Sequence, residues 1–160
     1  MTTESTSHFI QPGWFTQHVF NPAVAMLTRL GISIAGSRVL EVRGRKSGQP
    51  RRTPVNLLTH EGERYLVAPR GNTQWARNLR AGGSGRLLVG RRSEGFSARE
   101  LDDAEKEPIL RAYLRRWKWE VGAFFEGVGP DSSQDELRRI ASKHPVFKID
   151  AGTPPATKEN

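Results

Sequence analysis

The sequence contains no cysteine, and this absence removes several kinds of chemistry at once. Disulfides, a thiolate nucleophile and cysteine-ligated zinc or iron–sulfur sites are all excluded. The absence fits a reducing cytoplasm, which is the expected location. No nucleophile-elbow motif occurs, so a Ser–His–Asp triad is not expected. No metal site is expected either, because no two histidines stand at metal-ligand spacing. The four histidines are His8, His18, His60 and His144.

Long apolar runs are also missing. No stretch of about 18 apolar residues occurs, so we expect no transmembrane helix. The segment Met1–Ser7 is polar and lacks the basic and apolar regions of a signal peptide. Residues 13–30 form an amphipathic stretch, which leaves a peripheral membrane contact open as a second location.

Acidic residues are scarce in one part of the chain. The formal net charge is +8, and residues 38–99 hold 14 Arg or Lys against 4 Asp or Glu. Nineteen of the basic residues are arginine, which binds phosphate and carboxylate through paired hydrogen bonds. A solvated basic surface is one explanation, and nucleic-acid binding is another. No DNA or RNA signature occurs and the charge gathers around turns, so nucleic acid is not an expected partner.

The length of 160 residues suits one folded domain. We expect a flexible arm at 1–12, a single domain at 13–150 and a disordered tail at 151–160. Apolar residues at helical spacing predict helices between 13 and 30 and at 103–117, and Asn72 or Thr73 is expected to cap a helix ending near 81. Further helix is predicted within 118–127 and 134–143.

Alternating apolar segments predict six strands with short loops between the first three, which indicates an antiparallel meander. We therefore predict a mainly β fold with flanking helices, in the form of a small antiparallel barrel of about six strands. The predicted strands are 39–43, 53–59, 64–68, 86–90, 95–100 and 145–150.

A glycine-bounded turn between the first two strands is the strongest local signal. Residues 44–54 read GRKSGQPRRTP. Glycines at both ends allow a tight turn with exposed amides, and the surrounding Arg and Lys side chains complete an anion-binding cradle. The spacing matches neither a Walker A loop nor a Rossmann fingerprint. An ordinary charged hairpin remains the alternative.

A second signal follows the third predicted strand. Residues 68–78 read APRGNTQWARN, which places a glycine turn directly before a predicted helix. The start of a helix offers unpaired N–H groups and a partial positive charge to an anion. Trp75 is suited to stacking against a ring, although burial in the core is the more frequent fate of such a residue.

Together with Pro145–Phe147, these two segments resemble the deazaflavin-dependent nitroreductase family of the split β-barrel, flavin-reductase-like superfamily. The resemblance covers residues 15–104 and weakens beyond them. It implies an FMN-binding type of split barrel that holds coenzyme F-420, an 8-hydroxy-5-deazaflavin with a phosphate and an oligoglutamate tail. The implied activity is hydride transfer from the reduced coenzyme to a small electron-poor acceptor: a nitroaromatic, a quinone or an enone. FMN in the same fold and a non-catalytic coenzyme carrier are the alternatives.

The resemblance also implies a set of site residues. In the family the basic turn binds the phosphate and tail, a proline lines the ring, and the loop and helix after the third strand complete the pocket. The matching cofactor-binding residues are Arg45, Lys46, Ser47, Arg51, Arg52, Thr53, Pro54, Ala68, Pro69, Arg70, Gly71, Trp75 and Asn78. The expected substrate pocket consists of Trp14, Phe15, Phe20 and Asn56.

The sequence departs from the family at one of these positions. Some members place a tyrosine where Asn56 stands, so family substrates are not carried over. No catalytic residue is assigned, since Tyr65, Tyr113 and solvent are all possible proton donors. Either a monomer or a homodimer is compatible with the sequence.

Overall fold

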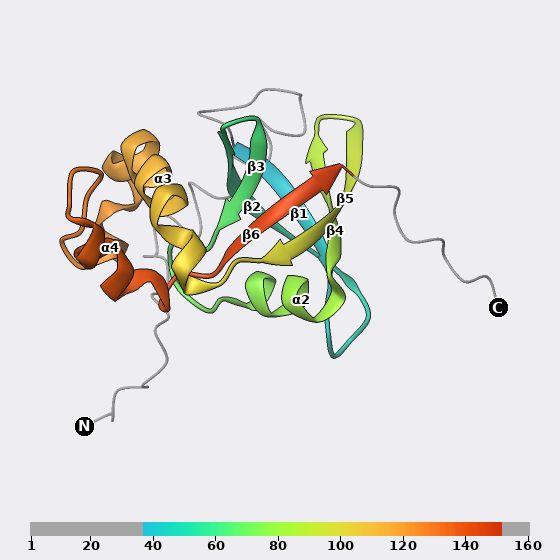
Figure 1. Ribbon diagram of the computed structural model, residues 1–160. Helices are drawn as coiled ribbons and strands as arrows, with labels where there is room; N and C mark the ends of the chain where they lie inside the picture. The colour runs from blue at the N-terminus through green and yellow to red at the C-terminus, as the bar shows by residue number, and fades with distance from the viewer. Residues whose placement is uncertain (1–36, 152–160) are drawn as a thin grey trace.

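The computed structural model describes residues 37–151 of the chain. Six antiparallel strands close a barrel in the order β1-β2-β3-β6-β5-β4, and the flanking helices lie outside it and across one end (Figure 1). This confirms the predicted mainly β barrel with flanking helices. The strands are β1 (Ser37–Arg43), β2 (Pro50–His60), β3 (Glu63–Val67), β4 (Ser84–Val89), β5 (Arg92–Glu100) and β6 (Val146–Ala151).

Five strands begin earlier than the apolar pattern predicted, and the difference is largest, three residues, in β2 and β5. β2 starts at Pro50 because its pairing with β1 continues to Arg43 at the base of the turn. β5 starts at Arg92, which pairs with Val89, so the predicted loop at 91–94 is mostly strand. Backbone pairing to a neighbouring strand therefore overrides the low strand preference of these polar segments.

The barrel interior holds one of two hydrophobic clusters. Helix α2 (Gln74–Gly82) contributes Ala76 and Leu79 to this cluster and lies across the lower end of the barrel in Figure 1. Thr73 caps the helix as predicted, since its side chain accepts a hydrogen bond from the Ala76 amide at 3.4 Å. Gly83 ends the helix in the left-handed conformation, with φ 72°.

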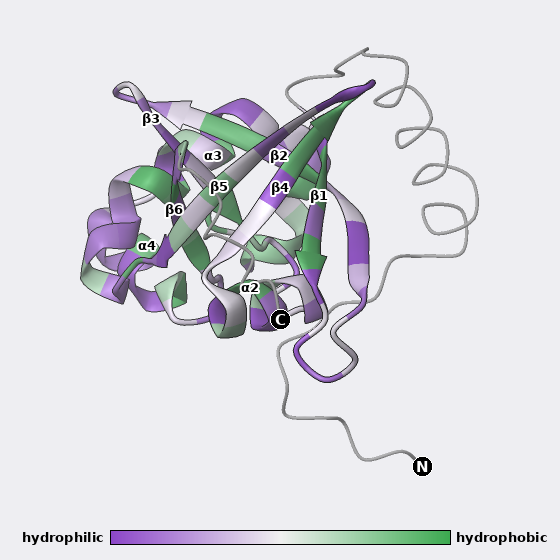
Figure 2. Ribbon diagram, turned by 90° about the vertical axis from the view of Figure 1, so that its right-hand side faces the viewer, coloured by the Kyte–Doolittle hydropathy of each residue, from purple (hydrophilic) through white to green (hydrophobic). Residues whose placement is uncertain are grey.

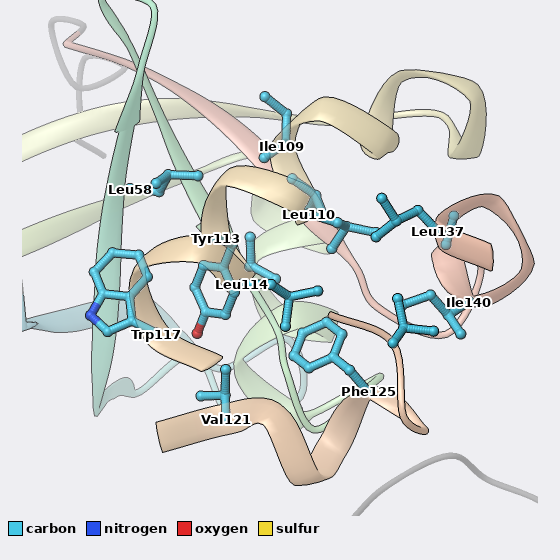
Figure 3. Packing of buried hydrophobic residues seen from close by; sticks show 14 of the residues in the cluster. Leu58, Ile109, Leu110, Tyr113, Leu114, Trp117, Val121, Phe125, Leu137 and Ile140 are labelled. Atoms are coloured by element: carbon cyan, nitrogen blue, oxygen red, sulfur yellow. The ribbon is translucent and has the colours of Figure 1, made fainter. Parts of the chain in front are cut away.

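The second cluster lies between the outer face of the barrel and the remaining helices. These are η2 (Asp103–Glu105), α3 (Lys106–Val121), η3 (Gly122–Phe125) and α4 (Gln134–Ala141). Figure 3 shows Leu58 of β2 facing the apolar side chains of α3. Ile109, Leu110, Tyr113 and Leu114 of α3 are buried there.

Helix α3 extends beyond its predicted end at Trp117. The backbone kinks there, with φ −124° and ψ 16°, and the helix continues to Val121. Trp117 is fully buried and its ring lies 5.0 Å from that of Tyr113 (Figure 3). Residues 118–121 therefore form an additional turn of α3.

Within residues 37–151 no helix is long and apolar enough to cross a membrane.

Candidate functional site

β2 is much longer than β3, and among residues 37–151 this difference leaves part of its edge without a neighbouring strand. β2 pairs with β1 from Pro50 to Asn56, but it pairs with β3 only from Leu57 to His60. The chain leaves β3 after Val67 and turns into the loop that leads to α2. We call Pro50–Asn56 the open edge of β2. The basic turn leads directly into it, and the loop to α2 begins where the pairing of β3 with β2 ends.

The basic turn, residues 44–49, lies at one end of the open edge. Its amides close the turn internally, because Gly44 donates to the Gln49 carbonyl at 2.8 Å and Gly48 donates to the Gly44 carbonyl at 2.9 Å. Gly48 has φ 71°, a conformation that favours glycine. Figure 2 shows this turn as a hydrophilic projection beside α2.

Arg45 attaches the basic turn to α2. Its backbone amide donates to Asn78 Oδ1 at 3.1 Å, and its Nη1 donates to the same oxygen at 2.8 Å. Nη1 also donates to Gln74 Oε1 at 2.9 Å. The structure therefore joins two segments that the sequence separates by 33 residues.

The arginines that follow the turn differ in their surroundings. Arg51 lies opposite the buried Val42, whereas Arg52 lies opposite Glu41 and forms a 2.7 Å ion pair with it. Successive strand residues point to opposite faces, so the two guanidinium groups leave β2 in opposite directions. Among the ion pairs of residues 37–151, none involves Arg45, Lys46 or Arg51. These three positive charges are therefore not compensated by a described carboxylate.

The loop from Ala68 to Thr73 follows β3 at the point where its pairing with β2 ends. The Gly71 amide donates to the Ala68 carbonyl at 3.2 Å, and Gly71 has φ 95°. A residue with a Cβ is strained in such a conformation, so this turn requires glycine. Trp75, the second residue of α2, is half-buried with its ring 6.1 Å from that of Phe147.

Arg70, in the same loop, is directed toward the helical segment after α3. Its guanidinium carbon lies 5.2 Å from the centre of the Phe124 ring, and burial lowers the pKa of Arg70. A cation over an aromatic face is favourable, so this contact holds the loop against η3. The sequence pattern around Phe124 contained no signal for it.

Asn56 lies at the far end of the open edge, next to α3. Its side chain lies close enough to Tyr113 and Glu120 to influence the pKa of both groups. Burial raises the pKa of both groups, and the contact with Asn56 acts in the opposite direction in each case. Tyr113 is 1% exposed. Sequence reasoning missed Glu120; a single carboxylate in the aromatic and basic segment RRWKWE is the signal that was available.

The remaining site predictions fall into three groups. Ser47 belongs to the basic turn, where its Oγ accepts from the Gln49 amide at 3.2 Å. Thr53, Pro54 and Pro69 are half-buried along the open edge and the loop. The predicted pocket residues Trp14, Phe15 and Phe20 lie outside the described residues, as do the predicted arm and most of the tail.

A cavity of about 210 Å³ opens on the outer face of β1, β2 and β4. Arg52 is the one predicted site residue that lines it, together with Arg91 and Arg92 of the β4–β5 hairpin. Neither the basic turn nor the loop from Ala68 to Thr73 contributes to its wall. It is therefore distinct from the site described above.

Solved structures share this fold. A structure titled as an F420-H2-dependent reductase, FDR-A, is 20% identical, covers 72% of this chain and 94% of that chain, and has a TM-score of 0.50. A domain-swapped dimer is 18% identical over 84% of this chain and 93% of that one, with a TM-score of 0.53. HutZ, a heme storage protein from Vibrio cholerae, is 9% identical over 75% and 84%, with a TM-score of 0.50. At these identities the likeness shows the split-barrel fold.

The family follows from the sequence match. Residues 12–120, more than half of the chain, match the model of the F420H(2)-dependent quinone reductase family, and the chain belongs to that family. It is a deazaflavin-dependent reductase of the split-barrel type, and coenzyme F-420 is its cofactor. No curated protein sequence matches the chain.

Proposed function

We propose that the chain binds F-420 along the open edge of β2 and uses the reduced coenzyme to reduce a quinone. In this proposal the phosphate and tail lie at the basic turn, and the ring lies between Pro54 and the loop containing Gly71. The acceptor approaches from the end marked by Asn56. The attachment of Arg45 to α2 carries the proposal, because it holds uncompensated cations beside the glycine loop and the start of a helix.

The residues fit a ligand that is anionic at one end and aromatic at the other. Arg45, Lys46 and Arg51 supply positive charge at the turn, where phosphate and carboxylates are bound by paired hydrogen bonds. From Arg51 to Asn56 the strand advances roughly 17 Å, at about 3.3 Å per residue. That length separates the charged end of the site from Tyr113 and Glu120 at the other end.

The coenzyme, when bound, supplies two-electron hydride chemistry, and the protein orients the reactants and excludes water. The backbone amides at the start of α2 carry a partial positive charge, which favours negative charge on a nearby ring. Asn56 places a polar amide at the acceptor end, near the buried Tyr113 and near Glu120. Partial burial raises the pKa of Glu120, so its protonated form is more favoured than that of a fully solvated carboxyl group.

Anaerobic turnover with reduced F-420 tests the acceptor class. We would offer a soluble quinone, a nitroaromatic and a conjugated enone at equal concentration and follow reoxidation of the coenzyme. The proposal expects the quinone to be reduced fastest. Faster reduction of either other acceptor would contradict the quinone assignment, and no acceleration over a protein-free control with any acceptor would contradict catalysis.

The family likeness supports a small-molecule acceptor as the partner of this site. A monomer or a homodimer remains the prediction for the assembly, and one structural relative is a domain-swapped dimer. Size-exclusion chromatography with light scattering distinguishes the two states.

A further inference from the structure

Asn78 matches a family position at the coenzyme pocket, but its contacts indicate a different task. We propose that Asn78 is a positioning residue, an uncharged clamp that orients Arg45 toward the coenzyme's phosphate and tail and leaves the arginine's charge available to them. This inference rests on the proposed function, because it specifies how one end of that site is built. The clamp consists of Asn78, assisted by Gln74.

The geometry shows that the Asn78 side chain is committed to the turn. Asn78 is 6% exposed, and its Oδ1 accepts from both the amide and the Nη1 of Arg45, at 3.1 and 2.8 Å. One oxygen thereby fixes the backbone of the turn and the direction of its guanidinium. Gln74, four residues earlier on α2, accepts from the same Nη1 at 2.9 Å. Residues spaced by four lie on one face of a helix, so both amides face the turn.

Other arginines of the barrel are held differently. Ion pairs with glutamates hold Arg52, Arg64, Arg80 and Arg99, and the distances between charged atoms run from 2.7 to 3.1 Å. Helix α2 reads QWARNLRAG and offers Arg45 only carboxamides. A carboxylate at position 78 would give the same two hydrogen bonds with higher strength. That carboxylate would also neutralise the positive charge of Arg45, so the attraction between Arg45 and an anionic ligand would be weaker.

The replacement Asn78→Asp separates orientation from charge, because aspartate has the same shape and keeps both acceptor contacts. Binding would be measured by fluorescence titration with two ligands: complete F-420, and its phosphate-free core of ring and ribityl chain alone. Asn78→Asp is expected to weaken F-420 binding about tenfold, which corresponds to the loss of one charge-assisted contact. Binding of the core should change by less than about twofold, the scatter we expect for a residue without contact to it.

Two further variants complete the design. Asn78→Ala removes the clamp and should also weaken F-420 selectively. Gln74→Glu introduces the charge at an exposed position, so it keeps the test open if the buried substitution prevents folding. Gln134→Glu, on the exposed start of α4, adds the same charge far from the turn and should leave both affinities unchanged.

The outcomes distinguish the inference from the function on which it depends. Equal losses for F-420 and for the core would overturn the positioning role, since Asn78 would then contact the ring. Full F-420 affinity in both Asn78→Asp and Gln74→Glu would also overturn it, because the charge of Arg45 would not be used. If the unsubstituted protein binds neither ligand, the proposed function itself is wrong.

Discussion

Arg51 and Arg52 are adjacent in sequence, and we expect replacement of Arg51 to weaken coenzyme binding more than replacement of Arg52. Removing either side chain lowers the net charge by one, so the long-range attraction for an anionic coenzyme changes equally. Arg51 has no carboxylate partner in an ion pair among the described residues, whereas Arg52 is paired with Glu41 at 2.7 Å. A difference in coenzyme affinity between the two variants therefore reports where each guanidinium group lies relative to the bound anion.

The expected magnitude follows from the exposure of the site. Hydrogen bonds to charged groups contribute about 1.5–3 kcal/mol, while exposed ion pairs contribute roughly 0.2–1 kcal/mol. Arg51 is exposed on β2, directly after the turn that α2 holds in place, so a value of about 1–2 kcal/mol lies between these limits. We expect Arg51→Ala to raise the Kd for F-420 about 5- to 30-fold, and Arg52→Ala about twofold or less.

The assay is a fluorescence titration of each variant with oxidised F-420 at low and at physiological salt. Screening weakens contacts between exposed charges, so the gap between the two variants should narrow as salt rises. Arg115→Ala, on the exposed side of α3, provides a control for loss of charge alone. Equal losses for Arg51→Ala and Arg52→Ala, or a larger loss for Arg52→Ala, would refute the placement of the anion at the basic turn.

Three further outcomes follow from burial and backbone geometry. Burial raises the pKa of Glu120, so the stability that its protonated form provides is present at low pH and is lost as pH rises through the raised pKa. Glu120→Gln should therefore raise the Tm relative to the parent near about pH 8 but not near about pH 4, and an equal shift at both would contradict this account. Gly71→Ala forces a Cβ into a φ of 95° and should cost roughly 1–2 kcal/mol while weakening coenzyme binding. Gly82→Ala is its control, since a Cβ there meets nothing within 4 Å. Trp117→Ala empties a fully buried position and should cost about 3–5 kcal/mol by chemical denaturation; a loss under about 1 kcal/mol would contradict its place in the core.

Much of the fold is predictable from local pattern. The period-two strands, the cap at Thr73 and the apolar face of α3 all follow from short segments of sequence. The early start of β5 does not, because it depends on the pairing of Arg92 with Val89 across a hairpin. The pattern predicted separate helices at 103–117 and within 118–127, and it did not show that α3 continues through a kink at Trp117 to the buried Val121.

The candidate site also has features that the sequence predicts and contacts that only the structure shows. The glycine-bounded turn and the loop before α2 are visible as motifs, and their residues could be named from sequence. The contact between Arg45 and Asn78 spans 33 residues, and the pairing of Arg52 with Glu41 depends on strand register. The junction of Asn56 with Glu120 joins residues brought together only by packing of α3 on the barrel. Sequence therefore identified the parts of the site without their connections.

Titration of the purified protein with oxidised F-420 tests the central claim most directly. The account expects saturable binding with a Kd below about 100 μM, equivalent to roughly −5.5 kcal/mol, and weaker binding at high salt. Binding should also be weaker for the phosphate-free core, which lacks the groups that the basic turn is built to hold. No saturable binding of F-420 up to about 100 μM would contradict the coenzyme site on the open edge of β2.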